Sequence, residues 1–69
     1  MYGILIEFEN RPEILFENGT LYGGLHCGEC FSVLLDQWYP VRLEYQEDWI
    51  LIYKNQVLPI PYSHQVFIE

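Results

Sequence analysis

The sequence predicts an all-β fold, either a small SH3-like barrel or a curled antiparallel meander of about six short strands. Short segments rich in β-branched and aromatic residues alternate with turn residues along the whole chain. No window shows a sustained helical period. A length of 69 residues allows one domain, residues 1–69, and closing its sheet would leave no long edge strand open.

The N-terminal half predicts a strand followed by a hairpin. Residues 2–8 form an apolar strand that the turn residues 10–13 close. Residues 14–17 and 20–22 flank Asn18-Gly19. This pair favours a two-residue hairpin turn, because both residues tolerate a positive φ.

The C-terminal half predicts the remaining strands, at residues 31–35, 38–45, 49–54, 57–58 and 65–69. Asp36-Gln37, residues 46–48 and Asn55-Gln56 supply the turns between them. Pro59 and Pro61 exclude a continuous central strand after residue 58, since proline has no N–H to donate to a sheet.

Residues 38–45 show the two faces of a strand. By alternation one face carries Tyr39, Val41, Leu43 and Tyr45, and the other carries Trp38, Pro40, Arg42 and Glu44. We expect the core to include Tyr39, Val41, Leu43, Ile50 and Ile52. Alternation places Trp49 with Leu51 and Tyr53, which leaves its face open. On the outer face Trp38 and Arg42 could stack as a contact patch; the alternative is that Trp38 caps the barrel.

The net charge of −7 excludes some partners and favours others. Ten acidic residues face three basic ones, Arg11, Arg42 and Lys54, so no basic stripe for nucleic-acid phosphates can form and an anionic membrane surface is disfavoured. A basic protein surface is the favoured partner; the alternative is that the charge only keeps the domain soluble. The absence of a signal-like or membrane-spanning run predicts a cytoplasmic protein with reduced thiols.

The segment from His26 to Cys30 holds both cysteines, Cys27 and Cys30, around Gly28. A turn at the glycine lets two thiolates face one point, as a tetrahedral zinc ion requires. His64 and His26 could complete a closed structural site, and a position left to water would make it catalytic. The alternative is that both cysteines are buried as small apolar residues. Thioredoxin-like and catalytic patterns are missing, so we expect no enzyme.

A longer pattern runs through the middle of the chain, from Tyr22-Gly23-Gly24-Leu25-His26-Cys27-Gly28-Glu29-Cys30 through residues 38–44 to Asp48-Trp49. It resembles a family of short uncharacterised domains carried by phages and conjugative elements of Gram-positive bacteria. The resemblance implies a protein that binds and inhibits a host defence protein in the bacterial cytoplasm. Its sharpest form is an anti-CRISPR protein that blocks DNA loading by a Cas9-type effector, whose channels are basic. The alternative is a zinc-stabilised accessory module of a mobile element.

For contact with such a partner the sequence offers an acidic hairpin end. Glu44, Glu47 and Asp48 are expected to cluster there, beside Trp38 and Arg42. Exposed charges are screened over about 8 Å at physiological ionic strength, so this contact should weaken as salt rises.

Overall fold

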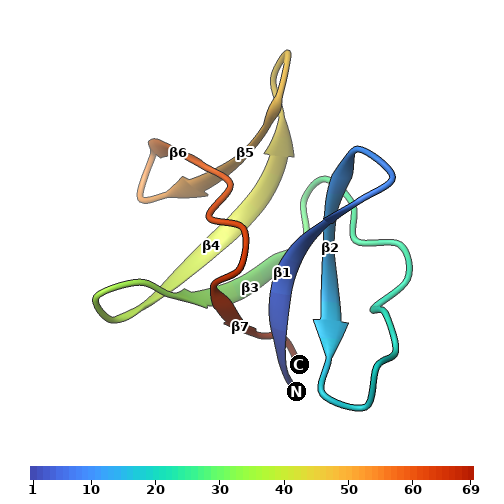
Figure 1. Ribbon diagram of the computed structural model, residues 1–69. Coiled ribbons are helices and arrows are strands. Elements are labelled where there is room, and N and C mark those ends of the chain that lie inside the picture. Colours follow the sequence, from blue (N-terminus) through green and yellow to red (C-terminus); the bar gives the residue numbers. More distant parts are fainter.

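The computed structural model describes all 69 residues and is all-β, with seven antiparallel strands in one open sheet (Figure 1). The strands are β1 (Tyr2–Phe8), β2 (Arg11–Phe16), β3 (Cys30–Leu34), β4 (Trp38–Tyr45), β5 (Trp49–Tyr53), β6 (Gln56–Pro59) and β7 (Gln65–Phe67). The predicted fold class, a curled antiparallel sheet, is confirmed. None of the chain forms a helix with the length and apolar character needed to cross a membrane.

The last strand joins the two halves of the sheet. The strand order is β2-β1-β7-β3-β4-β5-β6, so β7 lies between the N-terminal hairpin and the β3–β6 meander. Phe67 pairs with Tyr2 on one side and with Ser32 on the other. The chain ends lie side by side (Figure 1), since the Met1 ammonium donates to the Ile68 carbonyl at 2.6 Å and the Ile68 amide donates back at 2.9 Å.

One face of the curled sheet supplies the core. Alternate residues of both halves point to this face, and their side chains meet in a single cluster of eleven buried apolar residues: Leu5, Ile14, Phe16, Leu25, Phe31, Val33, Val41, Leu43, Leu51, Val66 and Ile68. The expected burial of Val41 and Leu43 is confirmed. Tyr39 is half-buried at the edge of the cluster, where its ring meets that of Tyr53 edge-on at 4.9 Å.

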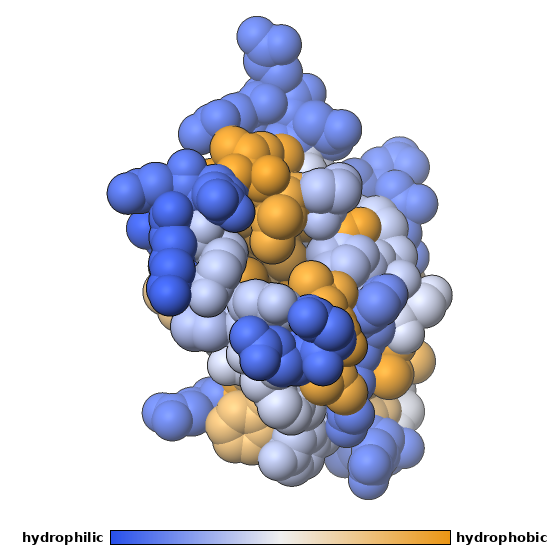
Figure 2. Space-filling view, turned by 90° about the vertical axis from the view of Figure 1, so that its left-hand side faces the viewer, coloured by the Kyte–Doolittle hydropathy of each residue, from blue (hydrophilic) through white to orange (hydrophobic).

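In β5 the core face is the opposite of the one expected. Leu51 is fully buried opposite Leu43, and Trp49 and Tyr53 pack against the same cluster. The expected burial of Ile50 and Ile52 is therefore wrong: both are half-buried on the outer face. The register set by the turn at residues 46–48 decides this, since a shift by one residue exchanges the two faces of a strand. Figure 2 shows apolar surface on the side that carries the β5–β6 hairpin, set between hydrophilic side chains.

Two tight turns lie earlier in the chain than the sequence predicted. Glu9-Asn10 and Lys54-Asn55 each combine two positive φ angles, 52° and 63° in the first and 47° and 65° in the second. This combination matches the twist of a two-residue hairpin. As a result β2 starts at Arg11 and contains Pro12, which a strand at the end of the sheet order tolerates.

The other predicted turns lie where they were expected. The Leu35 amide donates to the Gln37 carbonyl across Asp36, and the Gln46 amide donates to the Asp48 carbonyl. The Asn18-Gly19 turn is closed by a bond from the Gly19 amide to the Phe16 carbonyl, but its second arm contributes only one bridge, Leu15 to Leu21.

Candidate functional site

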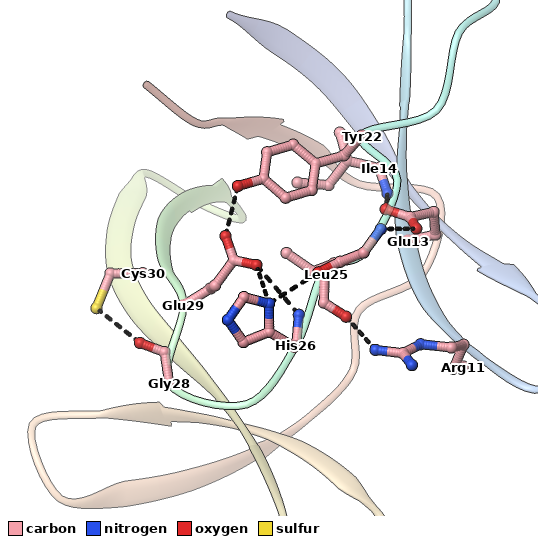
Figure 3. Close-up of polar contacts among 10 residues, drawn as sticks. Arg11, Glu13, Ile14, Tyr22, Leu25, His26, Gly28, Glu29 and Cys30 are labelled. Atoms are coloured by element: carbon pink, nitrogen blue, oxygen red, sulfur yellow. Dashed lines mark hydrogen bonds and ion pairs between the residues drawn. The ribbon is translucent and has the colours of Figure 1, made fainter.

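A single carboxylate organises the loop that contains the cysteines (Figure 3). Glu29 is only 16% exposed. Its Oε2 accepts a hydrogen bond from the Tyr22 hydroxyl at 2.6 Å, and its Oε1 accepts one from the His26 amide at 3.2 Å. We call residues 22–30 the knuckle. Glu29 holds the first half of the knuckle against the second, which no spacing rule for metal ligands would have suggested.

The knuckle is fixed to the sheet at both ends. On the β4 side, the Gly28 amide donates to the Leu43 carbonyl at 2.8 Å, and the Leu43 amide donates to the Glu29 carbonyl at 2.9 Å. On the β2 side, the buried Glu13 carboxylate accepts from the Gly24 amide at 3.2 Å, and the Arg11 guanidinium donates to the Leu25 carbonyl. These bonds hold the knuckle in one backbone conformation.

The same network orients the His26 ring. Its Nδ1 lies 2.7 Å from Glu29 Oε1 and 2.8 Å from the Gly24 carbonyl oxygen. Both neighbours are acceptors, so Nδ1 carries the proton of the neutral ring and Nε2 keeps its lone pair. The side chain is 71% exposed. This orientation, with a carboxylate on the second ring nitrogen, is the one found in metal-binding histidines.

The cysteines and His64 do not form the expected metal site. Cys27 and Cys30 are both exposed, so the alternative in which they pack as core residues is wrong. His64 Nδ1 lies 2.9 Å from the carbonyl oxygen of Leu34, at the opposite end of β3 from Cys30. Four residue-to-residue steps along the strand separate these ends, roughly 13 Å.

No three His, Cys, Asp or Glu side chains are placed to hold a metal ion. The predicted ligand set of Cys27, Cys30, His64 and His26 therefore does not fit a closed zinc site in this arrangement. Zinc binding stays a prediction from the sequence, which elemental analysis of the purified protein tests.

The bond between Tyr22 and Glu29 gives the knuckle a spectroscopic signature. The hydrogen bond to Glu29, followed by burial and the charges of Glu29 and Glu13, raises the pKa of Tyr22 above its ordinary value of 10.0. The stability contributed by neutral Tyr22 is fully present below the unfolded pKa and is lost as pH rises through the higher folded pKa.

Replacing Glu29 with alanine is expected to lower the pKa of one tyrosine, Tyr22, so that it titrates at lower pH. An ultraviolet absorbance titration of Glu29→Ala should show one tyrosine of the six moving toward its ordinary pKa, while Glu17→Ala, at an exposed position, leaves the curve unchanged. Superimposable curves for Glu29→Ala and the unsubstituted protein would contradict the assigned bond.

A second feature lies on the outer face of the sheet. The Tyr2 ring centroid is 4.8 Å from that of Phe67 and 6.0 Å from that of Trp38. We call Tyr2, Trp38 and Phe67 the aromatic patch. Tyr2 is 52% exposed and Trp38 is 40% exposed, and Phe67 is half-buried. Ile4, which is also exposed, extends the apolar surface along β1.

The sequence located only one member of the aromatic patch. Period-2 alternation in residues 2–8 and 65–69 would have placed Tyr2 and Phe67 on one face of their strands. It could not show that β7 lies beside β1, because the two strands come from opposite ends of the chain.

The residues predicted to bind a partner are not all together. Trp38 begins β4, while Glu47 and Asp48 lie beyond its far end, and the seven residue-to-residue steps of this strand span roughly 23 Å. Arg42 Nε is paired with Glu44 Oε2 at 2.7 Å, and no stacking with Trp38 is present. The stacked pair is instead Arg11 over Trp49, at 5.0 Å from the ring centroid.

Most of the negative charge has no cationic partner within the chain. Arg42–Glu44 is the one ion pair between charged side chains, and the neutral His26 ring contacts Glu29 through a hydrogen bond. Asp36 accepts a hydrogen bond at 2.8 Å from the Tyr39 hydroxyl, and this bond is the main reason that the pKa of Tyr39 is raised. The carboxylates outside ion pairs include those of Glu7, Glu9, Glu17, Asp36, Glu47, Asp48 and Glu69.

Comparisons with known proteins show what the chain is similar to. Residues 4–64 match the family model described as "Domain of unknown function (DUF5348)". A crystal structure of a protein from Ruminococcus gnavus is 38% identical in sequence, with a TM-score of 0.82 over 99% of this chain and 100% of that one. No curated protein matches the sequence.

Proposed function

This chain belongs to the DUF5348 family, and we propose that it is a non-enzymatic module that binds the basic surface of a partner protein through its aromatic patch. The cluster of exposed Tyr2 and Trp38 around half-buried Phe67 carries this proposal. Tryptophan and tyrosine are enriched among the residues that contribute most to protein–protein binding. Their large, rigid rings cost little conformational entropy when they are buried by a partner.

The charge distribution supports a basic partner. A net charge of −7 produces a long-range field that attracts a basic surface and repels acidic ones. The carboxylates that have no internal partner are available to pair with it, and they surround the molecule at several turns. The aromatic patch would then supply the short-range contact, while the charge supplies rate and specificity.

Replacing Trp38 with alanine is expected to reduce capture of the partner strongly. A central tryptophan of an interface contributes about 2 kcal/mol or more, so binding should weaken roughly 30-fold. The measurement is affinity capture from host lysate at several salt concentrations, quantified by mass spectrometry. Phe8→Ala is the matched control, since Phe8 is an exposed aromatic residue outside the patch. Equal capture by both variants would contradict the assigned contact.

A more specific proposal is that the partner is a host defence protein. Among such proteins, a Cas9-type effector is the preferred candidate. Support comes from the resemblance of the sequence pattern to domains of phages and conjugative elements, and from the basic channels of such effectors. Blocking DNA loading requires only that the domain occupy such a channel in the bacterial cytoplasm.

A cleavage assay tests that form. An excess of the domain should inhibit target cleavage by an effector from the host range, and inhibition should decline as salt rises. Trp38→Ala should relieve inhibition and Phe8→Ala should not. If no host effector is inhibited, the Cas9 form falls and the partner belongs instead to the mobile element, as expected for an accessory module.

A further inference from the structure

An acid-rimmed groove lies at the other end of the sheet from the aromatic patch. It encloses about 420 Å³ between the end of β1, the β4–β5 turn, β6 and the segment that leads into β7. Its lining is mainly apolar and aromatic and includes Glu7, Asp48, Trp49, Val57, Ile60 and Tyr62.

Two carboxylates from different elements converge on this groove. Glu7 comes from β1 and Asp48 from the β4–β5 turn. Both lie close enough to the Tyr62 hydroxyl to raise its pKa, after burial as the largest cause. Neither is in an ion pair. Asp48 Oδ1 accepts from the Trp49 amide at 2.8 Å, which fixes the side chain.

No cationic side chain of the chain itself lines the groove. The Arg11 guanidinium lies 5.0 Å from the centroid of the Trp49 ring, which lines the groove, and it also donates to the Leu25 carbonyl on the knuckle. A groove with two unpaired carboxylates on its rim and an apolar, aromatic lining is complementary to a long side chain that ends in a positive charge.

We propose that this groove binds a lysine or arginine side chain of the basic partner, with Glu7 and Asp48 facing the charge and Tyr62 and Ile60 packing on the aliphatic stem. The inference rests on the proposed function, since it names the chemistry of the group that the partner presents. A metal ion is the weaker occupant, because no three ligating side chains are gathered there. The Tyr62 ring favours a cationic group further, since aromatic rings attract cations, whereas the Trp49 ring already carries the Arg11 guanidinium.

A small probe tests the groove without the partner. We would titrate the isotope-labelled domain with N-acetyl-arginine amide and follow its amide and indole signals by NMR. The two tryptophans separate the sites: the Trp49 indole in the groove should shift, and the Trp38 indole in the aromatic patch should not. N-acetyl-citrulline amide, which is neutral and of similar shape, should give little shift.

Two double variants that remove the same charge distinguish the effect of the groove on binding from the effect of the net charge. Glu7→Gln with Asp48→Asn should weaken probe binding about five- to tenfold, as expected for the loss of two partly exposed charge pairs. Glu9→Gln with Glu47→Gln removes the same charge from neighbouring residues outside the groove and should leave binding nearly unchanged. Equal losses in both pairs, equal shifts with citrulline, or shifts centred on Trp38 would overturn the assignment.

The outcome is independent of the aromatic patch. If the probe fails to bind but capture still depends on Trp38, the groove assignment falls and the proposed function stands. If the probe binds at Trp49 but capture does not depend on Trp38, the result contradicts the aromatic patch as the main contact and supports the groove assignment.

Discussion

Replacing Val66 with aspartate is expected to unfold the protein. Val66 is fully buried and pairs with Gly3 on one side and Val33 on the other, so it lies at the junction of the two halves of the sheet. A carboxylate there has no partner in the core and costs several kcal/mol. A domain of this length has a stability of only about 3–10 kcal/mol, so a loss of about 4 kcal/mol or more leaves little folded protein.

Val57→Asp is the matched control for this variant. It makes the same chemical change at a strand position that is 58% exposed, where substitutions usually shift stability by about 0.5 kcal/mol or less. Circular dichroism with urea denaturation compares the two. A cooperative transition for Val66→Asp close to that of Val57→Asp would show that β7 does not hold the halves together.

Replacing Gly3 with valine is the second change expected to have a large effect. A Cβ on Gly3 would lie 2.6 Å from Ile14 Cγ2 and 2.9 Å from the carbonyl oxygen of Leu15. The carbonyl belongs to the neighbouring strand β2, so it cannot move without disturbing the β1–β2 pairing. Overpacking of this kind costs about 1–3 kcal/mol for small additions, and valine adds two methyl groups beyond the Cβ.

Tyr2→Val provides the comparison for Gly3→Val. It introduces the same side chain at the adjacent, 52% exposed position of β1 and should leave the urea midpoint near that of the unsubstituted protein. We expect Gly3→Val to lower the free energy of unfolding by about 3 kcal/mol. A loss below about 0.5 kcal/mol would mean that β1 and β2 are less closely packed than described.

The local structure of the chain could be predicted from sequence because it depends on near neighbours. The bounds of β1 and β4 agree with the alternating segments at residues 2–8 and 38–45, and three of the turns lie where turn residues cluster. The turns at Glu9-Asn10 and Lys54-Asn55 were predicted too late in the chain, because glutamate and lysine rarely adopt a positive φ and their sequence does not indicate one.

The placement of β7 and the composition of the site could not be predicted in this way. Pairing of the last strand with β1 and β3 is a contact between distant parts of the chain, and alternation within one strand carries no information about its neighbours. For the same reason the sequence grouped Trp38 with Glu47 and Asp48, which lie at the opposite end of β4, and missed Tyr2 and Phe67. His64 was expected to return to the cysteines from the irregular segment after β6, and it lies instead at the other end of β3.

Contact between the aromatic patch and a basic partner protein is tested most directly by site-specific photo-crosslinking in host cells. A photoreactive amino acid replaces Trp38 in one variant and Phe8, an exposed aromatic residue outside the patch, in the other. Position 38 should give one discrete adduct with a protein that carries a basic surface, and extraction at high salt before irradiation should reduce it. The absence of an adduct at position 38, or the same adduct from both positions, would contradict binding through the patch.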